Sequence, residues 1–396
     1  MAEAASSIQG QGRLFILINQ DWFFLSHFVD RALALQRDGY QVTVICPDSG
    51  RAREIIGLGL DYLPLSLQRH GTNPLGELRA LLQLRRAYRD LRPDMAWHIG
   101  LKAIVLGTLA SVWAGRSGGI VNAPVGMGFV FASNGLVARI LRPAVRTALR
   151  FLLNPKQSRA VFENADDMRE LINARAVHKR DAVLIRGAGV DLGDYAPTAE
   201  PDGVPVVLFA SRLIWEKGVG VFAAAAKLLH DRGFEARFVI AGRIDGDSSS
   251  AVPKAQLLDW QSEGTLEWIG PRQDMPNVLA SCTIFCLPTW YREGLPKVIL
   301  EAMACQRAVV TTDTVGCREA VTNMSNGLLV PPKDAAALAA ALEALLQNPV
   351  LRQRLAKRGR ARAVEEFGTE AVCGQTLDVF RSLKHDDRGI FTSKKR

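Results

Sequence analysis

Hydrophobic residues recur along the chain as short, nearly continuous runs, and stretches with helical spacing lie between them. The first runs cover residues 14–18 and 41–46. Such runs predict strands that are buried on both faces, as in a parallel sheet. Residues 26–37 fit a helix closed by Gly39, and residues 48–58 fit a further short helix. The strand–helix–strand order is typical of a doubly wound α/β domain.

The same rhythm restarts in the second half of the chain. Residues 195–205 contain three prolines, acidic residues and a glycine, so they predict an interdomain linker. We expect two Rossmann-like domains that face each other across a cleft. The predicted strands of the second domain cover residues 206–210, 236–241, 266–269, 283–287 and 308–312, and its predicted helices cover residues 218–232, 296–305 and 335–347.

Composition adds limits on the class of protein. The chain has 396 residues, of which 48% are hydrophobic and 22% charged, as in ordinary globular cores. Six scattered cysteines without a paired framework fit a reducing cytosol. The first residues lack the pattern of a signal peptide. The longest apolar run, residues 103–115, is shorter than the roughly 20 residues that span a bilayer, so we expect a buried helix and a soluble or peripheral protein.

The positive charge is unevenly distributed. Residues 1–180 hold 23 Lys and Arg against 14 Asp and Glu, whereas the remainder holds 26 of each kind. The whole excess of +9 therefore lies in the first half, which suggests an anionic partner there. Nucleic acid and anionic lipid are both candidates, but the chain has no helix-turn-helix, RNP or zinc signature.

The first motif with chemical meaning spans residues 293–301, EGLPKVILE, between a predicted strand and a predicted helix. Glu293 falls in the loop and Glu301 more than one turn into the helix. A carboxylate accepts two hydrogen bonds from a vicinal diol, so both suit a sugar or a ribose, and the helix start offers N–H groups to a diphosphate. Alone, a capped helix with two surface glutamates is an equally good interpretation.

The second motif spans residues 211–218, SRLIWEKG, directly after the strand at 206–210. Arg212 can hold a phosphate with two hydrogen bonds and Lys217 adds a compact positive charge. Open α/β sheets bind ligands at the carboxyl ends of their strands, where both residues lie. Two solvated basic residues are the alternative interpretation.

These elements, followed by Asp313-x-x-Gly316-x-x-Glu319, occur in the order found in glycosyltransferase family 4, and the chain resembles that family over residues 13–383. The family has the GT-B fold and retains the anomeric configuration. The sequences at 21–27, 126–131, 187–191 and 292–296 resemble a bacterial branch that builds lipid-linked oligosaccharides. That branch includes N-acetylgalactosaminyl transferases acting on diphospho-undecaprenol sugars.

The resemblance implies roles by position. Arg212 and Lys217 match the pair that neutralises the donor diphosphate, Glu301 the ribose ligand, and Glu293 the residue that contacts the transferred sugar. Backbone groups near Gly294 and Leu295 would assist. Pro296 stands where the family usually has glycine, which removes one N–H donor. Further donor-binding candidates are Lys297, Arg243 and Arg272. The nucleotide-sugar is a co-substrate, and no cofactor is implied.

The family's usual catalytic-site histidine is missing, since the corresponding stretch at 122–128 has none. His98 ends a predicted strand and His27 opens a helix beside Asp21, although a lone histidine is more often structural. A front-face mechanism, in which the donor phosphate takes the acceptor proton, needs no side-chain nucleophile. The candidates for the acceptor side of the cleft are Asp21, His27, His98, Lys102, Gly126 and Gly128.

Two further patterns qualify this interpretation. Asp245-Gly246-Asp247 has the spacing of metal-dependent glycosyltransferases, but its polar surroundings favour a solvated turn, and we expect no metal site. Arginines recur at helical spacing among aliphatic residues at 136–159, and residues 78–92 form a second basic helix. We expect the first set to contact an anionic membrane surface rather than to be only a solvated face; it consists of Arg139, Arg142, Arg146 and Arg150.

The sequence therefore predicts a metal-independent, retaining glycosyltransferase. It would move a sugar from a UDP-sugar to a lipid-linked glycan, and the first candidate for that sugar is an N-acetylhexosamine. The protein would be bound peripherally at the inner face of the cytoplasmic membrane. A nucleotide-sugar 2-epimerase or a GDP-sugar-dependent transferase are the alternatives. The expected domains are 13–195 and 206–368, joined by a linker at 196–205, with a helix at 369–385 that crosses back. Residues 1–12 and the charged tail at 386–396 are expected to be disordered.

Overall fold

The computed structural model describes residues 10–67, 74–115, 118–125, 147–246 and 248–391. They form two compact units. The first unit comprises Met1–Ile185 and Val372–Arg396, and the second comprises Arg186–Ala371. The last helix, α16 (Thr369–Phe391), begins in the second unit and continues in the first.

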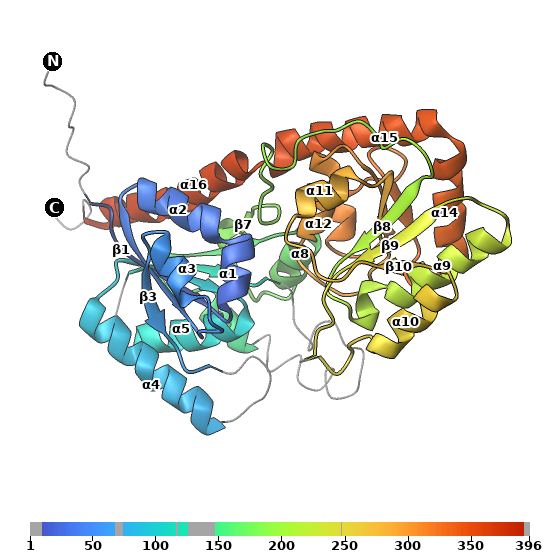
Figure 1. Ribbon diagram of the computed structural model, residues 1–396. Helices are drawn as coiled ribbons and strands as arrows, with labels where there is room; N and C mark the ends of the chain where they lie inside the picture. The colour runs from blue at the N-terminus through green and yellow to red at the C-terminus, as the bar shows by residue number, and fades with distance from the viewer. Residues whose placement is uncertain (1–9, 68–73, 116–117, 126–146, 247, 392–396) are drawn as a thin grey trace, which may run out of the picture. The chain divides into compact units, whose positions relative to one another are not determined.

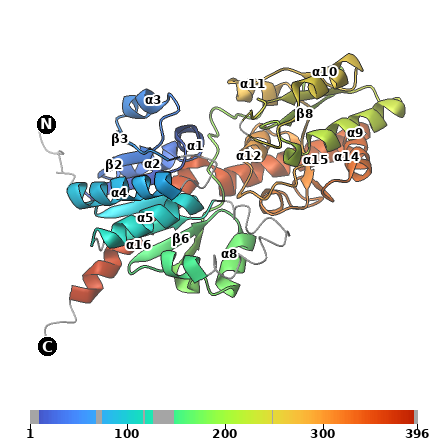
Figure 2. The ribbon, with the colours of Figure 1, turned by 90° about the horizontal axis from the view of Figure 1, so that it is seen from below.

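The first unit is built on a parallel sheet (Figure 1). Its strands lie in the order β3-β2-β1-β4-β5-β6-β7. Its strands are β1 (Gly12–Ile18), β2 (Tyr40–Cys46), β3 (Asp61–Pro64), β4 (Met95–Ile99), β5 (Gly119–Ala123), β6 (Ser158–Phe162) and β7 (Ala182–Leu184). Its helices before α16 are α1 (Asp21–His27), α2 (Val29–Arg37), α3 (Ala52–Gly57), α4 (Pro74–Leu91), α5 (Leu101–Trp113) and α8 (Ala165–Asn173). Helices α4 and α5 lie side by side in both views (Figures 1 and 2).

The second unit has a parallel sheet in the order β10-β9-β8-β11-β12-β13. Its strands are β8 (Val206–Ala210), β9 (Arg237–Ala241), β10 (Glu267–Trp268), β11 (Ile284–Leu287), β12 (Ala308–Thr312) and β13 (Leu328–Val330). Its helices are α9 (Val219–Asp231), α10 (Lys254–Ser262), α11 (Met275–Ala280), α12 (Lys297–Ala304), α13 (Cys317–Ala320), α14 (Ala335–Gln347) and α15 (Pro349–Arg362).

Each sheet has one point at which its strand order reverses. In the first unit β1 lies between β2 and β4, and in the second unit β8 lies between β9 and β11. The loops that leave the carboxyl ends of neighbouring strands diverge at such a point and leave a crevice for ligands. The inner strands β4, β5, β8, β11 and β12 are almost wholly buried, as unbroken apolar runs predict, whereas β3, β7 and β10 are half-buried or exposed.

Several expected boundaries are wrong. The helix expected at 26–37 is two helices, because the chain turns at Phe28 between α1 and α2. Gly12 belongs to β1 and the amide of Gln11 donates to the carbonyl of Gly39 at 2.9 Å, so these two residues are ordered. Helix α16 extends to Phe391, so the charged tail is helical over 386–391.

Candidate active site

The loop after β8 carries the two expected cations and is tied to the loop after β11. The backbone carbonyl of Glu216 accepts hydrogen bonds from the amides of Trp290 at 2.9 Å and Tyr291 at 3.1 Å. The hydroxyl of Thr289 donates to the same carbonyl at 3.1 Å. Both loops leave the point where the second sheet reverses its strand order, so Lys217 and Glu293 are brought to one place.

Lys217 forms the first ion pair of this place. Its ammonium nitrogen lies 2.5 Å from Oε1 of Glu293, and only 8% of the Lys217 side chain is exposed. The same nitrogen lies 5.5 Å from the ring centre of Tyr291. A cation that is held in a partly dry site by a carboxylate and an aromatic ring is well placed to receive a second anion.

Arg212 forms the second ion pair. Its partner is Asp245, for which the sequence-based prediction of a solvated turn is wrong. Nη1 of Arg212 lies 2.6 Å from Oδ2 of Asp245. We expected Asp245 to lie in a solvated turn, but the residue is only 3% exposed. The loop after β9 folds back onto the loop after β8, which removes Asp245 from water and gives its carboxylate an arginine partner. Asp247 lies outside the described residues.

Close backbone approaches around these pairs require glycine. Gly218 has φ +88°, and a Cβ atom there would lie 2.1 Å from the carbonyl oxygen of Pro288. Gly316 has φ +84°, and a Cβ atom there would lie 2.4 Å from the carbonyl oxygen of Gly294. Both glycines belong to the motifs identified in the sequence, and both let neighbouring strand-end loops touch where a side chain would force them apart.

Glu301 lies inside α12 and is largely buried. It shares a hydrogen bond with the hydroxyl of Tyr195, and its Oε1 lies 4.0 Å from the ammonium of Lys297. Burial raises the pKa of Glu301, although Lys297 and Tyr195 oppose the shift. From the sequence, Tyr195 is expected only at the boundary of the linker. No local pattern reveals its contact, because the two residues are more than a hundred positions apart.

The start of α12 carries the remaining residues of the Glu293–Glu301 motif. Pro296 is the residue before the helix, in an extended conformation, and the amide of Ile299 donates to its carbonyl at 3.0 Å. Leu295 is buried and lies close to Gly187, where a Cβ atom would meet its Cδ2 at 2.5 Å. The motif at residues 187–191 therefore packs against the start of this helix within the second unit.

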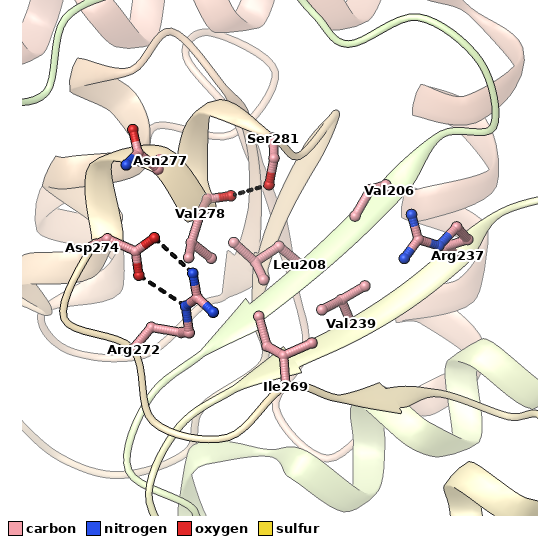
Figure 3. A pocket seen from close by; sticks show the side chains of 10 residues that line it. All are labelled: Val206, Leu208, Arg237, Val239, Ile269, Arg272, Asp274, Asn277, Val278 and Ser281. Carbon is pink, nitrogen blue, oxygen red and sulfur yellow. Dashed lines mark hydrogen bonds and ion pairs between the residues drawn. The ribbon is translucent and has the colours of Figure 1, made fainter.

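Arg272 lies away from Lys217, whereas Arg243 lies on a loop that contacts the loop of Arg212 and Lys217. Arg272 forms a two-point ion pair with Asp274, at 2.8 and 2.6 Å, at the rim of a cavity of about 410 Å³ (Figure 3). The walls of that cavity include Val206 and Arg237, the first residues of β8 and β9, whereas Arg212 and Lys217 follow the carboxyl end of β8. Arg243 is exposed, and its carbonyl accepts from the amide of Leu213 at 2.9 Å.

Asp21, in the first unit, already has hydrogen-bond partners within the protein. It is fully buried, and its carboxylate accepts hydrogen bonds from the amide and hydroxyl of Ser49, both at 2.6 Å, and from the amide of Trp22 at 2.7 Å. Burial raises the pKa of Asp21, but these hydrogen bonds outweigh that effect and the pKa is lowered. Asp21 therefore joins the loops after β1 and β2, and its assignment to the acceptor side stays a prediction.

His98 is likewise a structural residue. The ring is fully buried between the hydroxyl of Tyr88, 2.7 Å from Nε2, and Oδ1 of Asn122, 2.9 Å from Nδ1. The amide nitrogen of Asn122 donates to the carbonyl of Leu152 at 3.0 Å, so Oδ1 is the acceptor and Nδ1 of His98 donates. Burial lowers the pKa of His98 to about 4. A neutral ring with both nitrogens satisfied inside the core does not contact an acceptor.

The remaining candidates of the first unit have mixed outcomes. His27 is half-buried, with Nδ1 2.7 Å from the hydroxyl of Ser26. Lys102 pairs with Glu77 at 2.6 Å, and Glu77 lines a cavity of about 430 Å³ beyond the carboxyl ends of β2 and β3. Gly126 and Gly128 lie outside the described residues, as do Arg139, Arg142 and Arg146.

Comparison with known protein families gives matches in both halves of the chain. Residues 13–156 match the family model described as "Glycosyl transferase 4-like", and residues 204–348 match "Glycosyl transferases group 1". The two models together account for most of the chain, and each falls on one of the two halves in which sequence analysis placed a Rossmann-like domain.

Curated relatives agree with these family models. An N,N'-diacetylbacillosaminyl-diphospho-undecaprenol alpha-1,3-N-acetylgalactosaminyltransferase of Campylobacter jejuni is 29% identical over 85% of this chain and 89% of its own length. An alpha-D-kanosaminyltransferase of Streptomyces kanamyceticus is 30% identical over 61% of this chain and 62% of its own. Both relatives are sugar transferases, which favours transfer over epimerisation.

Solved structures show the same fold at low identity. HepE of Anabaena in complex with UDP-glucose has a TM-score of 0.72 at 19% identity, covering 94% of this chain and 100% of that one. A sucrose-phosphate synthase of Thermosynechococcus elongatus has a TM-score of 0.78 at 16% identity, covering 95% and 100%. Two parallel-sheet units with this likeness define the GT-B class of glycosyltransferase fold, as predicted. Over residues 13–156 and 204–348 the chain is therefore similar to the 4-like and to the group 1 glycosyltransferases, respectively.

Proposed function

We propose that the protein transfers a sugar from a UDP-sugar to a lipid-linked glycan, with retention of configuration and without a metal ion. The first candidate for the transferred sugar is an N-acetylhexosamine. The observation that carries this proposal is the pair of cations, Arg212 and Lys217, beside Glu293 at the strand-order reversal of the second sheet. The acceptor class and the first donor are taken from the Campylobacter relative and from the UDP-bound neighbour.

The chemistry follows from charge. When the bond between the anomeric carbon and the donor phosphate oxygen breaks, negative charge grows on the diphosphate. Arg212 and Lys217 would stabilise that charge, which is the task a divalent cation performs in other transferases. The acceptor hydroxyl would attack from the same face, and its proton would pass to the departing phosphate oxygen. Glu293 would hold the transferred sugar and Glu301 the ribose.

Donor choice and metal dependence can be tested together. A panel of UDP- and GDP-sugars, with mass detection of the free nucleotide, should show UDP release only when a lipid-linked glycan is present. EDTA should leave the rate unchanged, and NMR of the product should show the anomeric configuration of the donor. Loss of activity in EDTA with recovery in Mn²⁺ would contradict metal independence, and GDP release would establish the alternative donor.

Membrane contact is part of the proposal. No helix within the described residues is long and apolar enough to cross a membrane. Helix α5, expected to be buried, exposes Val112 by 62% and Trp113 by 49%. The adjacent helix α4 exposes Leu78 and Leu82, with Arg86 and Arg89 further along the same helix. We call these six residues the α4–α5 surface. Apolar side chains among arginines fit the interface of an anionic bilayer.

Two sets of substitutions test this contact. Replacing Val112 and Trp113 by Gln, or Arg86 and Arg89 by Gln, should reduce co-sedimentation with phosphatidylserine vesicles and slow transfer to a long-chain acceptor more than to a short soluble analogue. Each arginine at a membrane surface contributes about 1 kcal/mol. The matched control replaces Arg354 and Arg358, two exposed arginines of α15, by Gln.

The arginine stripe is tested in parallel with a Gln variant of Arg139, Arg142, Arg146 and Arg150. Of these, the structure describes Arg150, which is exposed beside Phe151, itself 74% exposed. Reduced vesicle binding in this variant alone would assign the contact to the stripe. If the stripe variant and the Arg86 and Arg89 variant both bind vesicles like the parent, electrostatic membrane contact through either region is contradicted.

A further inference from the structure

Asp245 is conspicuous because it is a buried carboxylate within the candidate donor site, and the sequence analysis gave it no role. Its side chain is 4% exposed, whereas that of its partner Arg212 is 31% exposed. The exposed surface of this ion pair therefore belongs almost entirely to Arg212.

The loop that carries Asp245 is anchored to the loop that carries Arg212. The amide of Leu213 donates to the carbonyl of Arg243 at 2.9 Å, and the amide of Val252 donates to the carbonyl of Leu213 at 3.0 Å. The amide of Trp215 donates to the carbonyl of Ser250 at 2.9 Å. The hydroxyl of Ser250 also donates to the carboxylate of Glu216. The backbone on either side of Asp245 is therefore fixed to the loop that carries Arg212.

Arginine has the chemistry to serve two anions at once. A guanidinium carries five N–H donors in a rigid plane and stays charged in proteins. One nitrogen bonded to Asp245 leaves the other donors for a ligand. An arginine without such a support would lose rotamer freedom only when the ligand binds, which weakens binding.

We propose that Asp245 is a positioning residue, which holds the guanidinium of Arg212 so that its exposed N–H groups are directed at the donor diphosphate. The inference rests on the proposed function, since it assumes that Arg212 binds that diphosphate. It also explains why this loop has an acidic residue beside a site for an anion. The gain in preorganisation outweighs the loss of one positive charge.

The test is a double-mutant cycle on the affinity for UDP, measured by calorimetry in EDTA with Asp245→Asn, Arg212→Ala and the double variant. Asp245→Asn should weaken UDP binding about tenfold, the effect of losing one charge-assisted contact. In the Arg212→Ala background the same change should alter affinity less than twofold, because the positioned group is gone. The matched control is Glu267→Gln, which removes the carboxylate of an exposed arginine pair in the same unit, with Arg237.

The failure of this inference and of the proposed function can be told apart. If Arg212→Ala binds UDP and transfers sugar like the parent, the proposed function is contradicted. If Arg212→Ala is impaired but Asp245→Asn binds UDP as tightly as the parent or more tightly, Asp245 competes with the diphosphate and the positioning role is overturned. If Asp245→Asn weakens UDP binding equally in the parent and in Arg212→Ala, Asp245 only stabilises its own loop and does not act through Arg212, which also overturns the positioning role.

Two additional measurements guard the test. Arg212→Lys keeps the charge and leaves Asp245 in place, but a lysine cannot bond both anions in the geometry of a fork. It should weaken UDP binding even if Asp245→Asn does not fold, and parental affinity in Arg212→Lys would overturn the inference. Repeating the titrations with Mn²⁺ should change nothing, whereas a gain in affinity that Asp245→Asn abolishes would make Asp245 a metal ligand.

Discussion

His98 in the first unit and Arg212 with Lys217 in the second all lie near the carboxyl end of a strand beside the point where its sheet reverses order. His98 is the last but one residue of β4, and the two cations follow β8. Their surroundings differ. The ring of His98 is fully buried and has both nitrogens satisfied by Asn122 and Tyr88. The cations of the second unit each have a carboxylate partner, and the side chains of Arg212 and Glu293 are still partly exposed.

The difference separates a structural polar cluster from a binding site. A group that is neutral, buried and fully hydrogen-bonded has nothing left to offer a ligand, and its removal costs stability. A paired cation at the end of a strand keeps spare donors and electrostatic attraction for an anion. Position in the fold is therefore not sufficient to assign function. The number of unsatisfied donors and the exposure of the pair decide it.

The largest expected effect concerns the cations. Lys217→Ala should lower kcat/KM by roughly a hundredfold to a thousandfold, about 3–4 kcal/mol, because the charge opposite the leaving diphosphate is lost in a partly dry site. The far-ultraviolet circular dichroism should stay unchanged. Steady-state kinetics with Lys227→Ala, an exposed lysine of α9, provides the control. If Lys217→Ala has the same kcat/KM as the parent, Lys217 is as structural as His98, and the proposed difference between the two places is contradicted.

The next effect concerns His98 and stability. Its pKa is lowered from the ordinary value of 6.5 to about 4. Between these values the unfolded chain binds a proton that the folded chain does not, so folding stability falls as pH falls from 6.5 to 4, by about 3 kcal/mol. Urea titrations of His98→Gln should lack this part of the pH dependence. His178→Gln, at an exposed site, should keep it.

His98→Gln also tests the other half of the comparison. The variant should keep transfer activity at neutral pH wherever it is folded, because the ring does not face a substrate. A hundredfold loss of kcat in a folded His98→Gln protein would show that the buried cluster takes part in catalysis after all.

A smaller effect concerns the loop backbone. Gly218→Ala places a Cβ atom 2.1 Å from the carbonyl oxygen of Pro288, at φ +88°. Gly233→Ala shares the left-handed conformation, at φ +81°, but has open space around the new atom. Thermal or urea unfolding should show Gly218→Ala to be less stable than Gly233→Ala by at least about 2 kcal/mol. Equal losses would mean that the two loops do not need their close approach.

The smallest effect separates the two glutamates. Glu301→Gln should weaken binding of free UDP about tenfold, because the ribose is present in the free nucleotide. Glu293→Gln should bind UDP nearly as well as the parent but transfer sugar more slowly. Tyr195→Phe, which removes the hydrogen bond to Glu301, should change UDP affinity by a few fold. Calorimetry gives the affinities, and equal losses for both glutamates would contradict their assigned division.

Much of the second unit was predictable from sequence. The strands at 206–210 and 308–312 and the helix at 335–347 have the expected bounds, because continuous apolar runs between turn residues leave little choice. The motif residues Lys217, Gly218 and Glu293 were identified because their spacing relative to those strands is local. Asp245 was misjudged because serines and glycine beside it indicate a turn, and burial of that turn comes from contacts with another loop.

The sequence by itself determined the two sheets, their parallel direction and the cationic and acidic residues at the strand ends of the second one, because these follow from local periodicity and short spacing. Only the tertiary structure decided that Asp245 is the partner of Arg212 and that Tyr195 is hydrogen-bonded to Glu301. It also decided that Asp21 and His98 are fully buried. Burial and the choice of a partner depend on contacts between residues that are distant in sequence, and local sequence patterns do not show such contacts.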